Sequence, residues 1–204
     1  MAPDPLDERQ RSALAVLAKL VQPGTYLGGG TAVACHLRHR ISRDLDLFHA
    51  TAEPLGEIDQ LAGPTAAVRI LNRAPGTLHL EVDGVPASLL RYRYPMLAPP
   101  VRVANVALPV AAIDDLVCMK LSAIAGRGMA RDFWDLHAML TTGRQPLAEA
   151  LDAYGRKYAA EDIGHLVRSL VYFADAQGGP LPNGLDAKHW RAMQRDFEGW
   201  VRAL

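Results

Sequence analysis

Hydrophobic positions follow two different periods along the chain, and the helical period comes first. Over residues 5–21, leucines recur at helical spacing, which predicts an amphipathic helix with Asp4 as its N-cap. Pro23-Gly24 ends this helix, because proline and glycine together favour a turn. Tyr26 and Leu27 are then expected to form the end of a short strand.

The middle of the chain changes to short segments with the period of strands. Asp83-Gly84 lies between two such segments and is a common closing pair of a two-residue hairpin. The elements expected here are a helix over 51–61, a strand over 68–71, a turn over 72–76, and hairpin arms over 77–82 and 85–92.

A proline-rich connector over residues 94–109, with one short strand near 101–103, leads into a second half with helical periodicity. The aromatic stripe of the last helix is interpreted as core packing. We therefore expect two parts, residues 1–108 with the sheet and residues 109–204 with a helical bundle. The expected helices cover 111–126, 130–140, 147–158, 162–176 and 187–204, with a loop over 178–184.

The stretch from Tyr26 to Phe48 combines a glycine turn with a helix start. Gly28-Gly29-Gly30 follows the strand, and glycine lets the backbone approach a ligand closely and adopt positive φ. Thr31 is expected to cap a helix from Ala32 to about Arg40, whose first backbone N–H groups can bind an anion. This arrangement favours a phosphate site, although a glycine run can also be an ordinary turn.

After Ser42 the pattern changes to period two, which places Asp44 and Asp46 on one face of a strand and the neighbouring leucines on the other. The two carboxylates would lie roughly 7 Å apart and would repel each other when both are ionised. Mg²⁺ relieves this repulsion, since it is normally held by one or two carboxylates plus substrate phosphates. The pattern indicates phosphoryl or nucleotidyl transfer; alternatively, the pair is ordinary exposed surface.

Two blocks of the sequence carry a resemblance to a known family. The first resembles the signature of the polymerase-β-like nucleotidyltransferases, and the two together resemble the AbiEii/AbiGii-type toxin nucleotidyltransferases. The resemblance covers about Tyr26 to Met139. The first block is Gly29-Gly30-Thr31, a helix, and His39-Arg40-x-Ser42-x-Asp44-Leu45-Asp46-Leu47-Phe48; the second is Lys120-Leu121-Ser122-Ala123-Ile124 with Arg131-Asp132-Phe133-Trp134-Asp135-Leu136.

The resemblance implies an α/β (α+β) fold of minimal polymerase-β-like type, with a small mixed sheet and a C-terminal helical bundle that completes the active site. The implied reaction transfers a nucleoside monophosphate from a nucleoside triphosphate to an acceptor hydroxyl, with Mg²⁺ as cofactor. Relatives act as the toxin of a two-gene toxin–antitoxin pair, and some modify transfer RNA. An RNA acceptor, tRNA above all, and a cognate antitoxin protein are therefore the expected partners. An antibiotic- or metabolite-modifying enzyme and a catalytically silent nucleotide-binding homologue are the alternatives.

The resemblance also implies roles for individual residues. Lys120 interrupts an apolar helical run, so its ammonium group is expected to reach a carboxylate or the triphosphate, or else to extend to the surface. Asp132, or alternatively Asp135, would act near the acceptor; both could instead form a helix-surface ion pair. The implied catalytic residues are Asp44, Asp46, Lys120 and Asp132, the metal ligands Asp44 and Asp46, and the nucleotide-binding residues Gly29, Gly30, Thr31, Arg40, Ser42 and Lys120.

A departure from the superfamily pattern occurs in the predicted hairpin. Relatives often carry a third metal-binding carboxylate on its outgoing arm, where this chain has Ser88. The expected metal site therefore has two carboxylates, unless Glu81 on the ingoing arm replaces the third. Glu81 could equally face solvent.

Composition bears on how this chain could bind RNA and on the cellular compartment in which it would act. The 204 residues include 22 Lys+Arg and 22 Asp+Glu, so RNA could bind only through local patches such as the arginines in 38–43 and 127–131. Cys35 and Cys118 fall on predicted apolar helix faces, which is typical of reduced thiols in the cytoplasm. The sequence shows neither a signal peptide nor a run of about 18 apolar residues, which predicts a soluble cytoplasmic protein without a membrane partner.

Overall fold

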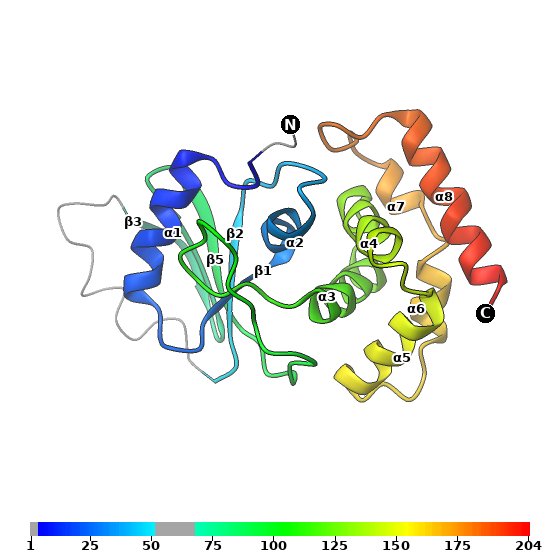
Figure 1. Ribbon diagram of the computed structural model, residues 1–204, viewed down its shortest axis with the longest axis horizontal. Coiled ribbons are helices and arrows are strands. Elements are labelled where there is room, and N and C mark those ends of the chain that lie inside the picture. Colours follow the sequence, from blue (N-terminus) through cyan, green and yellow to red (C-terminus); the bar gives the residue numbers. More distant parts are fainter. Residues whose placement is uncertain (1–3, 52–67) are drawn as a thin grey trace. The chain divides into compact units, whose positions relative to one another are not determined.

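The computed structural model describes residues 4–51 and 68–204. The helix predicted over 51–61 falls almost entirely on residues 52–67 and so lies outside the described residues. The chain forms two compact units, coloured along the sequence in Figure 1. The sheet unit comprises Met1–Tyr94 and Pro99–Ala112, and the helical unit comprises Pro95–Ala98 and Ile113–Leu204.

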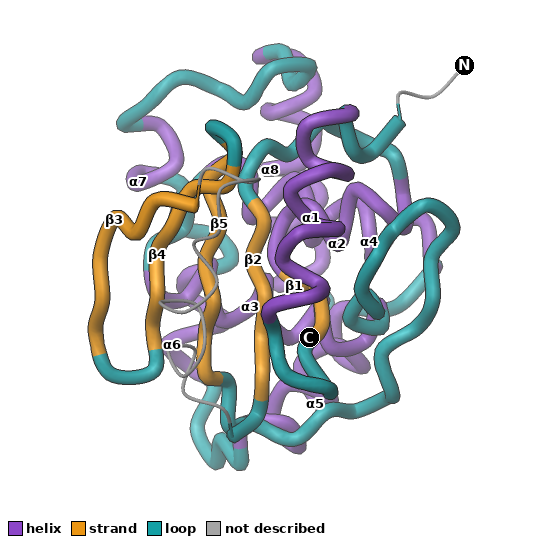
Figure 2. The backbone as a smooth tube through the Cα atoms, turned by 90° about the vertical axis from the view of Figure 1, so that its left-hand side faces the viewer, coloured by secondary structure: helices purple, strands orange, loops and turns teal. Residues whose placement is uncertain are grey.

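The sheet unit contains a five-stranded mixed sheet in the order β1-β2-β5-β4-β3. In Figure 2 the strands run from β3 at the left to β1 toward the right. The β2–β5 pair is parallel, and the β1–β2, β4–β5 and β3–β4 pairs are antiparallel. The α/β prediction with a small mixed sheet is therefore confirmed. The strands are β1 Tyr26–Gly28, β2 Leu45–His49, β3 Val68–Ala74, β4 Thr77–Val82 and β5 Val85–Arg91.

The two faces of this sheet differ in chemistry because side chains alternate along each strand. On one face, register aligns Leu47 with Leu89 and Leu89 with Leu78, and all three are buried. Helix α1, Glu8–Leu20, contacts β5, and helix α2, Gly29–Leu37, contacts β1 and β2. The opposite face carries the candidate site, with Asp46 on β2 and the buried Phe48 two residues further along the strand.

Helix α1 begins at Glu8 rather than near Pro5, and the prediction that Asp4 caps it is wrong. The Asp7 carboxylate accepts the Gln10 backbone N–H at 2.8 Å, and the Gln10 side chain accepts the Asp7 N–H at 3.1 Å. This capping box satisfies two helix-end donors at once, so it outcompetes a single cap.

Strand β3 is longer than predicted. The expected turn over 72–76 is wrong in its first three residues, because Asn72 to Ala74 continue the ladder with β4. A bulge between Ile70 and Asn72 accommodates the extra residue, and backbone pairing outweighs the low strand propensity of asparagine. The predicted hairpin arms and the Asp83-Gly84 turn are confirmed, with Asp83 at φ 49° and Gly84 at φ 81°.

The connector after β5 forms one isolated bridge between Val101 and Val110 in place of the short strand predicted over 101–103. Val110 and its neighbours also extend the β1 edge, where Leu27 donates to Pro109 O at 2.8 Å and Ala111 donates to Leu27 O at 2.9 Å. The connector is therefore held by backbone hydrogen bonds of the sheet unit.

The helical unit matches the predicted elements except at one place. The helix predicted over 162–176 is two short helices, of which the first ends at Ser169. Phe173 is the N-cap of the second and packs against Phe133 and Trp190 at centroid distances of 5.3 and 5.9 Å. Trp190 and Phe197 are buried, so the predicted core role of the last helix is confirmed. The helices are α3 Ile113–Gly126, α4 Ala130–Gly143, α5 Leu147–Tyr158, α6 Gly164–Ser169, α7 Ala174–Gln177 and α8 Ala187–Arg202.

A buried ion pair ties residues 95–98 to the helical unit. Lys157 Nζ lies 2.6 Å from Asp115 Oδ1, and both side chains are fully buried. The Asp115 carboxylate also accepts the backbone N–H groups of Leu97 and Ala98, and Lys157 donates to Pro95 O at 2.7 Å. Each buried charged or polar group in this cluster has an ion-pair or hydrogen-bond partner, which offsets the free-energy cost of removing that group from water.

Cys35 and Cys118 are buried on α2 and α3, as predicted. Burial raises the pKa of Cys35 to about 11 and that of Cys118 to about 12, so both thiols stay protonated and unreactive near neutral pH. Among the described residues, none of the helices has the length and apolar character needed to span a bilayer.

Candidate active site

The glycine turn lies directly between β1 and α2. Strand β1 ends at Gly28, helix α2 starts at Gly29, and Gly28 pairs with Asp46 in the antiparallel ladder. The prediction that Thr31 caps a helix starting at Ala32 is therefore wrong. Instead, the Thr31 hydroxyl donates to Asp44 O at 2.5 Å and fixes the start of β2 against the helix. The uncapped N-terminus of α2 keeps backbone N–H groups available for an anion.

Two glycines of the turn lie in close contact with other side chains, and Gly29 is the one that the backbone conformation also requires. Gly29 has φ 65°, and a Cβ at this position would overlap the Asp46 carboxylate. A Cβ at Gly30 would overlap the end of the Arg40 guanidinium and lie 3.1 Å from Ser42 Oγ. The turn therefore brings Asp46, Arg40 and Ser42 against the first residues of α2.

Arg40 is buried and contacts the glycine turn because α2 ends earlier than predicted. The helix stops at Leu37, and Arg38 adopts φ 52°, which reverses the chain direction. Arg40 is 8% exposed and donates to Ile41 O at 3.1 Å. A guanidinium beside the helix N-terminus adds positive charge at the position where a phosphate would bind.

Asp44 and Asp46 lie at the start of β2. Asp44 is exposed and immediately precedes the strand, while Asp46 is half-buried within it. Leu45 and Leu47 are fully buried on the opposite face, so the predicted alternation is confirmed. The ranges 4–51 and 68–204 contain no group of three or more His, Cys, Asp or Glu side chains arranged to hold a metal.

The position of the missing third carboxylate lies beside Asp46. Parallel pairing of β2 with β5 places Ser88 directly opposite Asp46, and Ser88 in turn pairs with His79 on β4. His79 Nδ1 lies 3.0 Å from Ser88 Oγ. Glu81 pairs with Arg69 at 3.1 Å, one pleat further along β4, so its charge is already balanced.

The second sequence block forms a charge cluster within the helical unit. Lys120 on α3 lies 3.0 Å from Asp132 Oδ1 and 2.7 Å from Asp135 Oδ2, both on α4. The two aspartate side chains are 0% exposed and that of Lys120 is 6% exposed, so the alternative of a helix-surface ion pair is wrong. The expectation that the Lys120 ammonium reaches a carboxylate is confirmed.

Arg127 completes this cluster, a role that the sequence analysis missed. Its Nε and Nη2 donate to the two Asp132 oxygens, each at 2.9 Å. Burial raises the pKa of Asp132, but the hydrogen bonds and charges of Arg127 and Lys120 outweigh it and hold this pKa below its usual value. Asp132 is therefore a firmly ionised carboxylate with both oxygens engaged.

Lys120 keeps part of its hydrogen-bonding capacity. An ammonium group has three donors, and the contacts with Asp132 and Asp135 use two of them. The third has no partner among the residues that the structure describes.

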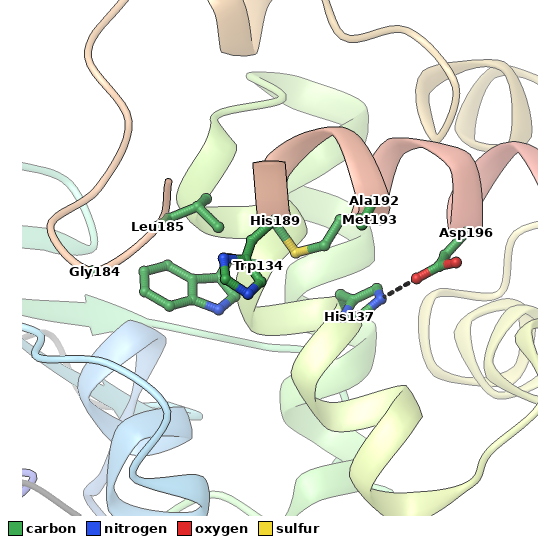
Figure 3. A pocket seen from close by; sticks show the side chains of 8 residues that line it. All are labelled: Trp134, His137, Gly184, Leu185, His189, Ala192, Met193 and Asp196. Carbon is green, nitrogen blue, oxygen red and sulfur yellow. Dashed lines mark hydrogen bonds and ion pairs between the residues drawn. The ribbon is translucent and has the colours of Figure 1, made fainter. Parts of the chain in front are cut away.

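A separate pocket of about 250 Å³ lies between α4 and α8 of the helical unit (Figure 3). Trp134, Leu185 and Met193 contribute apolar surface, and His137 forms an ion pair with Asp196 at 2.8 Å. The pocket lining contains none of the predicted site residues, and we assign it no part in the reaction.

The family follows from comparison of the whole sequence. A model of the nucleotidyl transferase AbiEii toxin family, of type IV toxin–antitoxin systems, matches residues 15–203. The chain belongs to the AbiEii family. The resemblance inferred from the two motif blocks is thereby confirmed. An uncharacterised protein of Aquifex aeolicus (strain VF5) is 35% identical over 175 residues, which is 84% of this chain and 85% of that protein.

Solved structures place this AbiEii protein in a nucleotidyltransferase fold. MenT4, a nucleotidyltransferase toxin of Mycobacterium tuberculosis H37Rv, superposes with a TM-score of 0.67 at 19% identity, covering 96% of this chain and 82% of that one. JHP933 of Helicobacter pylori gives 0.50 at 19%, covering 95% and 92%. The antibiotic-resistance factor ANT(2'')-Ia gives 0.53 at 15%, covering 76% and 95%. At these identities the similarity establishes the fold alone.

Proposed function

We propose that this AbiEii protein is a metal-dependent enzyme that transfers a nucleoside monophosphate from a nucleoside triphosphate to a hydroxyl of RNA, in particular tRNA. It would act in the cytoplasm as the toxin of a two-gene pair, with a cognate antitoxin protein as partner. The observation that carries this proposal is the close packing of the Asp46 carboxylate against Gly29 at the N-terminus of α2. It combines an anion-binding helix end with a carboxylate suited to a divalent cation.

Asp44 and Asp46 would hold Mg²⁺. The donor set fits this ion, because it consists of hard carboxylate oxygens, and the absence of a third carboxylate at Ser88 leaves positions for phosphate oxygens and water. The ion would neutralise charge that develops on the triphosphate as pyrophosphate leaves.

The α2 N-terminus would bind the phosphates that the metal does not reach. Gly29 and Gly30 allow close approach of the backbone, and Arg40 supplies a positive charge that cannot be neutralised by pH. Ser42 Oγ, next to Gly30, can donate a further hydrogen bond. Thr31 acts indirectly, because its hydroxyl proton is committed to Asp44 O.

In the helical unit, we assign Lys120 to triphosphate binding through its third N–H. Asp132 would position Lys120 and Arg127, because an ionised carboxylate with a lowered pKa and two occupied oxygens is a weak proton acceptor. Asp135 would share this positioning role.

The substitution Gly29→Ala is expected to weaken Mg²⁺ binding, because the added Cβ displaces the Asp46 carboxylate. Gly84→Ala is the matched control: Gly29 and Gly84 both have positive φ, 65° and 81°, but a Cβ at Gly84 meets nothing within 4 Å. Both variants should lose about 1–2 kcal/mol of stability from backbone strain. Only Gly29→Ala should also lose the rise in melting temperature that Mg²⁺ and a nucleoside triphosphate give the wild type; equal ligand responses in both would contradict the metal site.

The proposed reaction is tested by incubating the protein with each α-³²P-labelled nucleoside triphosphate, Mg²⁺ and total bacterial RNA. We expect label in the RNA fraction, and none when EDTA replaces Mg²⁺. A parallel incubation replaces RNA with aminoglycosides, because the fold is shared with an antibiotic-resistance factor. Label on the small acceptor alone would support the antibiotic- or metabolite-modifying alternative. Nucleotide binding without transfer to either would identify a catalytically silent homologue.

A further inference from the structure

A polar row crosses the sheet beside Asp46. In register, Asp46 on β2 lies opposite Ser88 on β5, and Ser88 lies opposite His79 on β4. Directly opposed residues project from the same face of a sheet, with neighbouring strands about 4.8 Å apart. Ser88 therefore stands between the proposed metal ligand and an imidazole that is two strands away.

Ser88 and His79 form a hydroxyl–imidazole pair. The Ser88 Oγ to His79 Nδ1 distance is 3.0 Å, so the hydroxyl can donate to Nδ1 when the ring proton is on Nε2. Both side chains are half-buried, which restricts water without removing access. A hydroxyl in hydrogen-bond contact with an imidazole can pass a proton to it.

Nucleotidyl transfer needs such a group, because the acceptor hydroxyl must lose its proton as it attacks. Asp44 and Asp46 would be committed to the metal, and Asp132 is held ionised by Arg127 and Lys120. Imidazole is the side chain whose ordinary pKa suits proton transfer near neutral pH.

Resting on the proposed function, we infer that His79 receives the acceptor's proton through the Ser88 hydroxyl. The acceptor oxygen forms a bond to the α-phosphorus, and the bond from this phosphorus to the bridging oxygen breaks, so that its electron pair leaves with pyrophosphate. The acceptor proton passes to Ser88 Oγ while the Ser88 proton passes to His79 Nδ1. The imidazolium later returns one proton to solvent.

The charged groups around His79 permit this role. On β3 its direct partner is Asn72, which is neutral, and the neighbouring Arg69 is paired with Glu81 of β4. On β5 its partner is the Ser88 hydroxyl, and Asp46 of β2 is the next residue in the row.

The test compares transfer to total bacterial RNA from pH 5 to pH 9. The wild-type rate should rise with pH to a plateau, since the imidazole must be neutral to accept a proton. His79→Gln and Ser88→Ala should each lower the plateau roughly 100-fold or more and abolish this rise with pH. His189→Gln, an exposed histidine on α8, is the matched control and should keep both rate and profile.

Rescue separates a chemical role from a structural one. In the double variant His79→Gln/Ser88→Asp, a carboxylate adjoins the site and can accept the proton directly. At least tenfold of the lost rate should return, with the rise moved toward pH 4. Nitrogen NMR should also find the His79 ring proton on Nε2 in the wild type at pH 8, independently of any acceptor.

Four results would overturn the inference. An unchanged pH profile in His79→Gln, a proton on Nδ1 of His79, or a nucleotide covalently attached to Ser88 in the intact-protein mass would each remove the relay while leaving nucleotide transfer itself in place. Absence of transfer by the wild type to any RNA would remove the proposed function, and the relay with it.

Discussion

Asparagine in place of Asp46 is expected to lower the rate of nucleotide transfer about a thousandfold, because metal-ion catalysis contributes several kcal/mol and each 1.4 kcal/mol is about a factor of ten. The fold should persist, since Asp46 is half-buried and lies on the face of β2 opposite the fully buried Leu45 and Leu47. Asn keeps the shape of the side chain and removes only its charge. The measurement is the initial rate of label transfer at saturating Mg²⁺.

Asp83→Asn is the matched control for Asp46→Asn. It removes the same charge from the sheet unit at the hairpin turn, where asparagine suits the positive φ of 49°. Its rate should equal that of the wild type. Circular dichroism should show both variants folded, and a rate within tenfold of the wild type for Asp46→Asn would remove Asp46 from the metal site.

Alanine in place of Asp132 is expected to destabilise the protein by about 3–5 kcal/mol, because it leaves the buried Lys120 ammonium and the Arg127 guanidinium without this partner. Asp152→Ala, an exposed aspartate on α5, should change stability by less than about 0.5 kcal/mol. Urea unfolding of both variants measures the difference. Adding Lys120→Met to Asp132→Ala should recover part of the loss, since it removes the buried charge.

The stability that Asp132 contributes also depends on pH. Its pKa is lowered in the folded state, so this contribution is fully present above the unfolded-state value near 3.9 and is lost as pH falls through the folded-state value. The gap between wild type and Asp132→Ala should therefore be constant from about pH 5 to pH 8 and should narrow in stronger acid. A gap that widened in acid would contradict the charge assignment.

Local patterns predicted those parts of the site that depend on neighbours in sequence. The spacing of Gly29, Asp44 and Asp46 implied a turn followed by a carboxylate strand, and the sheet pairs Gly28 with Asp46 accordingly. The sequence predicts the wrong start for α2 because Thr31 resembles an N-cap, whereas its hydroxyl donates to the backbone carbonyl of Asp44, 13 positions away. A long-range partner of this kind leaves no local signal.

Burial and pairing explain the remaining differences. The sequence pattern predicts RNA-binding charge at both Arg127 and Arg131, yet Arg127 donates to both oxygens of Asp132. The predicted hairpin fixes the register of β4 against β5 and so places Ser88 opposite His79. It does not show that Asp46 lies beside this pair, because that depends on the parallel pairing of β2 with β5. The sequence order of strands does not predict that neighbour.

The ion pair of Asp115 and Lys157 has a consequence for how this chain can be divided. Because Pro95, Leu97 and Ala98 bond to these two side chains, the helical unit is discontinuous in sequence. A fragment starting at Ile113 would lack three backbone partners of a fully buried carboxylate and ammonium, and each lost hydrogen bond of this kind costs about 1–3 kcal/mol. Exchange of helical units between relatives, by recombination or by engineering, therefore succeeds only when the tetrapeptide 95–98 is inherited together with residues 113–204.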